Sequence, residues 1–399
     1  MPRFPLPHEP PRRLPRRTVL RRLALSAGGA LALPGLIACS RDGGRGRGSG
    51  ATGGGGGEGK GPLVISNWPL YIDPSREGVP GSVERFERAT GIAVRYSEDQ
   101  NDAAAFFAKI QPELEAGRTL PQDLFVTTYW MAQRLIDLGW LEPLPLAEVP
   151  NRRHLNTELR KPSWDPSERF SLPWQSGISG IAYNLEATGR ELQDVDDLFD
   201  PKLRGRVGFL TEMRDSIGLL MLADGQDIRR PTYGAAEGAF RRLEQAKADG
   251  QIRAFTGNDY QKDLLSGNFA ACVAWSGDVA QLALEQPKLR FVVPRSGGLL
   301  WADVMVMPRG ARHRREAAAW MNFVYDPPEA ARIAAAVHYI SPVQGVQAIL
   351  AADPATARLS ASPLLFPDAA MRERLRVFGP LSAGEEARFD ERFATIVGA

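Results

Sequence analysis

Short apolar runs alternate with amphipathic segments along residues 63–139. Strands are predicted at 63–66, 92–96 and 123–126, and helices at 82–90, 103–116 and 129–138. Gly91, Gly117 and Gly139 follow the helical segments, as expected of residues that end a helix in the left-handed conformation. We expect Pro112 to kink the second helix. The alternation predicts a parallel sheet covered by helices, with ligands bound at the carboxyl ends of the strands.

A second set of elements follows over residues 178–337. Strands are predicted at 178–183, 206–210, 270–275, 289–293 and 304–307, and helices at 216–223, 235–248, 278–285, 315–325 and 328–337. Residues 63–399 form a longer segment than a single core usually supports. The chain therefore predicts an α/β protein of two domains or lobes.

The first 62 residues follow a different pattern. Arg16 and Arg17 precede an apolar segment at 23–38, which is shorter than the roughly 20 residues of a membrane span. A twin-arginine pair before such a segment is typical of an export signal, and Cys39 at its end is typical of a lipidated cysteine. We predict a twin-arginine lipoprotein signal peptide over 1–39, lipidation at Cys39, and an extracytoplasmic location. A signal peptide cut elsewhere, with Cys39 incidental, is the alternative.

Glycine dominates residues 40–62, which predicts a flexible tether between the anchor and the folded part. The whole chain has a net charge of +2, but residues 63–399 carry 38 basic and 44 acidic side chains, a net of −6. A mildly acidic body disfavours nucleic acid as a partner and tolerates cationic ligands. Cys272 is the only other cysteine, and its apolar neighbours predict a buried thiol.

Common enzyme motifs are absent from the sequence. After residue 39 the chain holds only His154, His313 and His338, and these are not spaced as metal ligands. There is no nucleophile elbow, phosphate-binding loop or HExxH motif, so we expect no cofactor and no metal. The glycines of Gly177-Ile-Ser-Gly180 favour a bend where the chain crosses between lobes.

Glu212 and Asp215 lie where a predicted strand ends and a helix begins. Their spacing can place both carboxylates on one side of the helix start, and such a pair could hydrolyse glycosides. The structural alternative makes Asp215 the N-cap of the helix and Arg214 its ion-pair partner.

Aromatic side chains gather at the predicted strand ends. The positions are Trp68 and Tyr71 after the first strand, Thr127 and Tyr129 after the third, Trp275 at a later strand end, and Trp301 with Asp303 before the strand at 304–307. Packing explains any one of these aromatics by itself. Aromatic faces beside carboxylates bind cations, so the whole set predicts a cation site.

These segments resemble the extracytoplasmic spermidine/putrescine-binding proteins of polyamine ABC transporters over residues 63–345. The resemblance rests on Ser66-Asn-Trp-Pro-Leu-Tyr71, Asp123-Leu-Phe-Val-Thr-Thr-Tyr129, Leu210-Thr-Glu-Met-Arg-Asp215, Ala274-Trp-Ser-Gly277 and Gly297-Gly-Leu-Leu-Trp-Ala-Asp303. It implies a two-lobe α/β fold of the type II periplasmic-binding-protein kind, in which each lobe is a mostly parallel sheet flanked by helices and a hinge joins the lobes. We expect one lobe to comprise 63–177 plus 302–347, and the other 178–301 plus 348–399.

The resemblance also implies which residues bind the ligand. The implied contacts are the aromatic pair Trp68 and Tyr71, the hydroxyl of Thr127, the rings of Tyr129, Trp275, Trp301 and Tyr339, the carboxylates of Glu212 and Asp215, and Asp303 as the grip on a terminal ammonium. Pro69 stands where a threonine can contribute a hydroxyl, and no glutamine lies near Phe378, so the choice among polyamines stays open.

The sequence therefore predicts a lipoprotein that closes two lobes around a polyamine and delivers it to an ABC transporter permease. We expect it to act as a monomer without catalytic residues. Two alternatives remain at this stage. The same fold could bind a betaine, a sugar or a metal chelate, or the chain could be an extracytoplasmic hydrolase that uses Glu212 and Asp215.

Overall fold

The computed structural model describes residues 61–398. The predicted signal peptide, the lipidation site Cys39 and residues 40–60 of the tether lie outside the described residues. The strands are β1 (Leu63–Asn67), β2 (Val94–Glu98), β3 (Leu124–Thr128), β4 (Ser171–Asn184), β5 (Val207–Leu210), β6 (Ile252–Thr256), β7 (Ala271–Trp275), β8 (Leu289–Val292), β9 (Gly298–Val306) and β10 (Leu375–Arg376).

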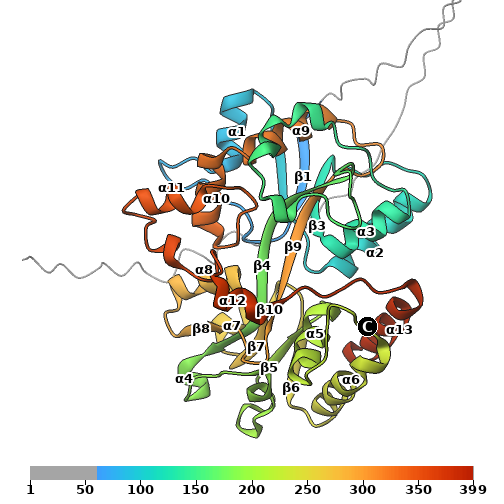
Figure 1. Cartoon of the computed structure of the whole chain (residues 1–399), viewed down its shortest axis with the longest axis vertical. Helices are drawn as coiled ribbons and strands as arrows, with labels where there is room; N and C mark the ends of the chain where they lie inside the picture. Colours follow the sequence, from blue (N-terminus) through green and yellow to red (C-terminus); the bar gives the residue numbers. More distant parts are fainter. Residues whose placement is uncertain (1–60, 399) are drawn as a thin grey trace, which may run out of the picture. The chain divides into compact units, whose positions relative to one another are not determined.

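Helices cover the strands on both sides (Figure 1). The α-helices are α1 (Ser82–Thr90), α2 (Ala103–Glu115), α3 (Tyr129–Asp137), α4 (Leu185–Thr188), α5 (Met213–Ala223), α6 (Tyr233–Ala248), α7 (Tyr260–Ser266), α8 (Ser276–Glu285), α9 (Arg314–Val324), α10 (Pro327–Val337), α11 (Val346–Ala352), α12 (Ala369–Arg374) and α13 (Ala383–Val397). Short 3-10 turns lie at Leu146–Glu148, Pro150–His154, Thr157–Leu159, Val195–Phe199, Pro201–Leu203 and Leu359–Ala361. Across residues 61–398, no helix is both long and apolar enough to span a membrane.

The strands form one sheet in the order β2-β1-β3-β9-β4-β7-β5-β6, with β10 on β9 and β8 on β4. Both ends of this sheet are parallel, because β1 pairs in parallel with β2 and β3, and β5 with β6 and β7. The long strands β4 and β9 are antiparallel to each other and to their outer neighbours. They run along the middle of the molecule and join its two parts (Figure 1).

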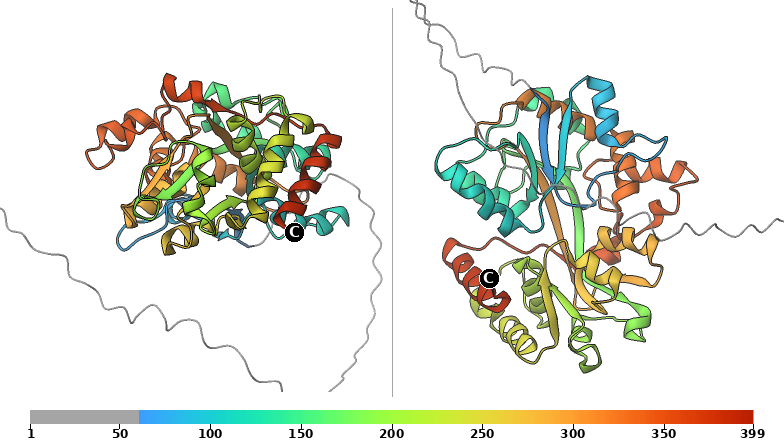
Figure 2. Two further views of the ribbon diagram at one scale, coloured as in Figure 1. Left: turned by 90° about the horizontal axis from the view of Figure 1, so that it is seen from below. Right: turned by 180° about the vertical axis from the view of Figure 1, so that it is seen from behind.

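Two separate cores of buried apolar side chains lie on either side of this middle region. One core draws its residues from 63–174 and 304–350, and the other from 181–299 and 378–396. We call the parts built around them the first lobe and the second lobe; the view from behind separates the same two parts (Figure 2). The exact chain positions at which the lobes divide stay a prediction.

Helix α1 shows how local sequence fixes an element. Its bounds agree with the predicted 82–90, and Gly91 ends it with φ of 72° in the left-handed region. Phe86 is buried on the inner face of α1, where its ring meets that of Trp320 at 5.2 Å. Behind it, the buried Glu329 binds Arg85 and accepts a hydrogen bond from Ser82, which ties α1 to α10.

Candidate functional site

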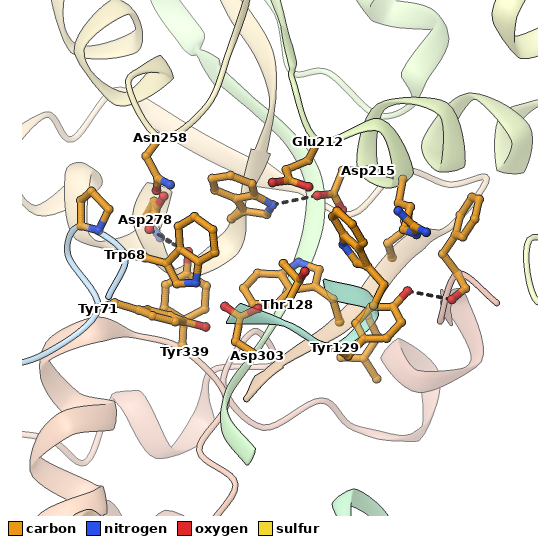
Figure 3. Close-up of a pocket in the computed structure, with 18 residues that line it drawn as sticks. Trp68, Tyr71, Thr128, Tyr129, Glu212, Asp215, Asn258, Asp278, Asp303 and Tyr339 are labelled. Carbon is orange, nitrogen blue, oxygen red and sulfur yellow. Dashed lines mark hydrogen bonds between the residues drawn. The ribbon is translucent and has the colours of Figure 1, made fainter. Parts of the chain in front are cut away.

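A cavity of about 60 Å³ lies between the two lobes. Its lining comes from both lobes and from the strands that join them (Figure 3). The lining residues are Trp68, Pro69, Tyr71, Thr128, Tyr129, Trp130, Glu212, Arg214, Asp215, Asn258, Trp275, Asp278, Leu299, Leu300, Trp301, Asp303, Tyr339 and Phe378. Nine of the ten ligand-binding residues predicted from the sequence are among them.

The exception is Thr127. Successive side chains of a strand point to opposite faces, and on β3 it is Thr128 that lines the cavity, while Thr127 is buried elsewhere. The structure therefore places Thr128, and not the predicted Thr127, at the cavity. Thr128 pairs with Asp303 in the β3–β9 ladder, and its hydroxyl makes no hydrogen bond in the structure of residues 61–398.

Asp303 lies inside β9, not before a strand as predicted, and is 4% exposed. Burial raises the pKa of its carboxyl to about 7, while the nearby Tyr71 hydroxyl opposes the shift and Asp215 adds to it. The Tyr71 hydroxyl makes no hydrogen bond of ordinary geometry. Within residues 61–398, no lysine, arginine or histidine forms an ion pair with Asp303.

Asp215 lies in the first turn of α5. Its carboxylate accepts hydrogen bonds from the Ser179 hydroxyl at 2.7 Å and from Trp275 Nε1 at 3.2 Å. Burial raises its pKa to about 6, against the lowering effect of these two donors. The structural alternative raised from the sequence is wrong in both parts, because the N-cap of α5 is Glu212 and Arg214 pairs with Glu386 at 2.6 Å.

Glu212 reaches from the second lobe to the first. Its carboxylate accepts a hydrogen bond of 2.7 Å from the backbone N–H of Ala103, the first residue of α2. Burial is the main cause that raises the pKa of Glu212 to about 8, and Asp215 contributes in the same direction. The two carboxylates at the start of α5 therefore have different partners, one in each lobe.

Asp278, which is buried, is a fourth carboxylate at the cavity, and the sequence analysis did not select it. It accepts hydrogen bonds from the hydroxyls of Tyr339 at 2.7 Å and Tyr260 at 2.9 Å, and from the Gln261 amide at 2.8 Å. Burial raises its pKa to about 6. Its position at the start of α8, three residues after Trp275, is the signal that could have found it, because a strand end followed by a helix start faces the cleft.

Aromatic rings form the walls of the cavity (Figure 3). Tyr339 meets Tyr71 edge-on at 4.8 Å and Trp301 at 5.6 Å, and Trp301 meets Trp275 edge-on at 6.5 Å. Trp301 Nε1 donates to the Ser179 hydroxyl at 2.9 Å. The rings are thus fixed by one another and by the polar groups beside them.

Gly177 is not the bend that the sequence predicted. It lies inside the continuous strand β4, paired with Trp301 of β9. A Cβ atom on Gly177 would stand 2.4 Å from the Trp301 ring and 2.9 Å from Tyr339. The glycine is therefore required because two aromatic rings pack directly on the backbone.

The balance of charge at the cavity is negative. Four carboxylates line it against one base, Arg214, whose guanidinium pairs with Glu386 and lies 4.1 Å from the centre of the Trp130 ring. Within residues 61–398, no group of three or more His, Cys, Asp and Glu side chains is placed to hold a metal ion. Carboxylates between aromatic faces suit an organic cation whose methylenes contact the rings.

Residues 81–364 match the family of bacterial extracellular solute-binding proteins, which is more than half of the chain. The chain belongs to this family. Members of the family carry solutes and are not enzymes. Together with its fold, the match makes this chain a two-lobe, extracytoplasmic solute-binding protein.

Among its relatives, the putrescine-binding periplasmic protein PotF of Escherichia coli is 27% identical over 78% of this chain and 85% of its own length. The spermidine/putrescine-binding periplasmic protein 1 of Haemophilus influenzae is 24% identical over 71% and 77%. A solved structure of a putative spermidine/putrescine ABC transporter protein from Listeria monocytogenes is 26% identical. It has a TM-score of 0.72 and covers 84% of this chain and 98% of its own.

Proposed function

We propose that this solute-binding protein captures a polyamine of the putrescine or spermidine class between its lobes and delivers it to an ABC importer. The observation that carries the proposal is the set of carboxylates around one cavity: Asp278 and Asp303 are buried, and Asp215 is half-buried. Arg214, the one base in the lining, is paired with Glu386. Each desolvated ammonium group of a polyamine supplies the positive charge that such a carboxylate needs. The names of the relatives point to the same ligands.

In this proposal each group has a stated role. Asp303 and Asp215 bind ammonium groups, and Asp278, held by two tyrosine hydroxyls, adds negative charge at the Tyr339 end. Trp275, Trp301 and Tyr339 contact the methylenes and the cations, along with Trp68, Tyr71 and Tyr129 from the first lobe. No bond is broken. A ligand that touches both lobes stabilises the closed state, which then docks on the permease.

Titration calorimetry with putrescine, spermidine and glycine betaine tests the ligand class. We expect heat with a polyamine and none with betaine, and we expect Asp303→Asn to weaken polyamine binding by about 10- to 100-fold, the range of a lost charge-assisted hydrogen bond. Asp227→Asn, on the exposed surface outside the cavity, is the matched control and should bind as the unchanged protein does. Equal affinity in Asp303→Asn would remove Asp303 from the site.

We also propose that the chain is exported by the twin-arginine route and anchored through a lipid on Cys39, working as a monomer. The supporting observation is the order of Arg16-Arg17, an apolar segment and Cys39 in the sequence. Mass spectrometry of the protein from membranes should find a diacylated Cys39 at the mature N-terminus. A mature protein that begins elsewhere and partitions into the aqueous fraction would contradict the anchor.

A further inference from the structure

A direct backbone contact joins the lobes at the edge of the cavity. Asn101 precedes α2 in the first lobe, and Asn258 lies between β6 and α7 in the second. The carbonyl oxygen of Asn101 accepts two hydrogen bonds of 2.9 Å, one from the backbone N–H of Asn258 and one from its side-chain amide. The backbone N–H of Asp259 donates to Asn101 Oδ1 at 3.3 Å. One residue of the first lobe is thus held by three donors of the second.

Gly257 makes this contact possible. A Cβ atom at this position would stand 2.3 Å from the carbonyl oxygen of Asn101 and 2.8 Å from its carbonyl carbon. These are backbone atoms, which cannot rotate away as a side chain can. Gly257 is absent from the positive-φ residues, so its backbone conformation is open to other amino acids. The glycine is therefore needed for the approach of Asn101 and not for the turn itself.

Glu212 makes the neighbouring contact with the same segment. Its carboxylate binds the N–H of Ala103, two residues after Asn101, at the positive end of the 13-residue helix α2. Asp102, the N-cap of α2, is already occupied with the N–H of Ala105. One oxygen of Glu212, Oε1, therefore contacts the backbone of the first lobe, and this contact exists only when the lobes are together.

We propose that Asn101–Ala103 of the first lobe and three residues of the second, Gly257, Asn258 and Glu212, form an interlobe latch. The latch stabilises the closed state through contacts between the lobes at the edge of the ligand cavity. The latch makes Gly257 and Asn258 positioning residues for capture, and it gives Glu212 the role of a closing contact and not of an ammonium ligand. The contacts of the latch form only when the lobes close, and they stabilise the closed state. Less of the ligand's binding free energy is therefore used to close the lobes. The assignment to capture rests on the proposed function.

Gly257→Ala tests the latch by stopped-flow binding of putrescine. We expect the dissociation rate to rise by about tenfold or more, because the closed state is lost, while the association rate with the open protein changes by less than about twofold. The melting temperature of the ligand-free protein should stay the same. Gly234→Ala is the matched control, since Gly234 is exposed in α6 with no neighbour within 4 Å of the added Cβ. Unchanged dissociation in Gly257→Ala would overturn the latch.

Glu212 offers a second test that does not depend on Gly257. A glutamine keeps an oxygen that accepts from the Ala103 N–H, whereas alanine removes it. We expect Glu212→Gln to bind putrescine within about threefold of the unchanged protein, and Glu212→Ala to lose about tenfold. Losses of tenfold in both variants would instead make Glu212 an ammonium ligand and refute its role in the latch.

A ligand-free measurement separates failure of the latch from failure of the proposed function. In a full-length Asn101→Cys, Asn258→Cys variant, an oxidant should form a disulfide across the cleft, and adding Gly257→Ala should slow that reaction about fivefold or more. Each single-cysteine variant controls for reaction with the free thiol of Cys272, and with Cys39 where it carries no lipid. If polyamines do not bind but Gly257→Ala slows formation of the disulfide, the latch is supported and the proposed polyamine ligand is refuted. If the cross-link forms equally fast in both proteins, the latch is refuted.

Discussion

At the scale of single residues, Asp303 shows a conflict between capture and stability. Its carboxyl is almost fully buried, and its pKa is raised to about 7 because burial penalises the charged form. In the unfolded chain the pKa of an aspartate is about 3.9. The folded protein therefore holds a proton that the unfolded chain releases between these two values, and stability falls as pH rises through that window.

Replacing the carboxyl should remove this penalty. We expect Asp303→Asn to raise the free energy of unfolding of the ligand-free protein by on the order of 1–3 kcal/mol at pH 8 and by little at pH 4. Circular-dichroism melts at the two pH values measure the effect. Asp227 is the control, because Arg229 lowers its pKa to about 2, so Asp227→Asn should bring no gain. An equal or lower melting temperature for Asp303→Asn at pH 8 would contradict the prediction.

Half of the cavity residues could be predicted from the sequence, because aromatic and acidic side chains at strand ends stand out against apolar runs. Two features of the site could not be predicted from the sequence. The choice between Thr127 and Thr128 depends on which face of β3 meets the cleft, and that is set by the pairing of β3 with β9. The place of Asp278 depends on two tyrosines, Tyr260 and Tyr339, that are distant in the chain and meet only in the fold.

At the scale of elements, the site depends on Gly177 in β4, because the rings of Trp301 and Tyr339 pack directly against its backbone. Gly177→Ala in β4 should displace the Trp301 ring, because the added Cβ would stand 2.4 Å from it. We expect polyamine affinity to fall by about tenfold or more, together with a change in tryptophan emission. Calorimetry and fluorescence measure the two effects. Gly234→Ala again serves as control, and unaltered affinity in Gly177→Ala would show that Trp301 does not wall the site.

Elements with strong local signals were predicted well, as α1 shows, whereas elements made by distant contacts were not. The strand predicted at 178–183 is the second half of β4, which starts at Ser171 and includes Pro173. Helix α13 had no predicted counterpart. The apolar face of α13 is buried by packing against α6, where the ring centres of Phe389 and Phe240 lie 5.3 Å apart. Long-range packing overrides the weaker local pattern in both cases.

At the scale of the whole molecule, the acidic balance of residues 63–399 should speed the arrival of a cationic ligand. The association rate of spermidine should fall several-fold between about 20 and 200 mM salt, while the dissociation rate changes less, because screening acts on the encounter and less on buried pairs. Stopped-flow traces over a salt series measure both rates. An association rate independent of salt would show that the net charge does not guide the ligand.

The pairing of β4 with β9 has a mechanical consequence. The two strands are paired from Ser171 opposite Val306 to Pro173 opposite Val304, and again from Ser176 opposite Ala302 to Ser179 opposite Leu299, with a shift of register between Pro173 and Ser176. Bending the pair of strands requires no hydrogen bond between them to break. The lobes can therefore open while β4 and β9 stay paired. Amide protons along these rungs should exchange slowly whether the protein is empty or loaded. A ribbon that bends without unpairing also returns to one register, which would bring the same residues opposite each other at every cycle.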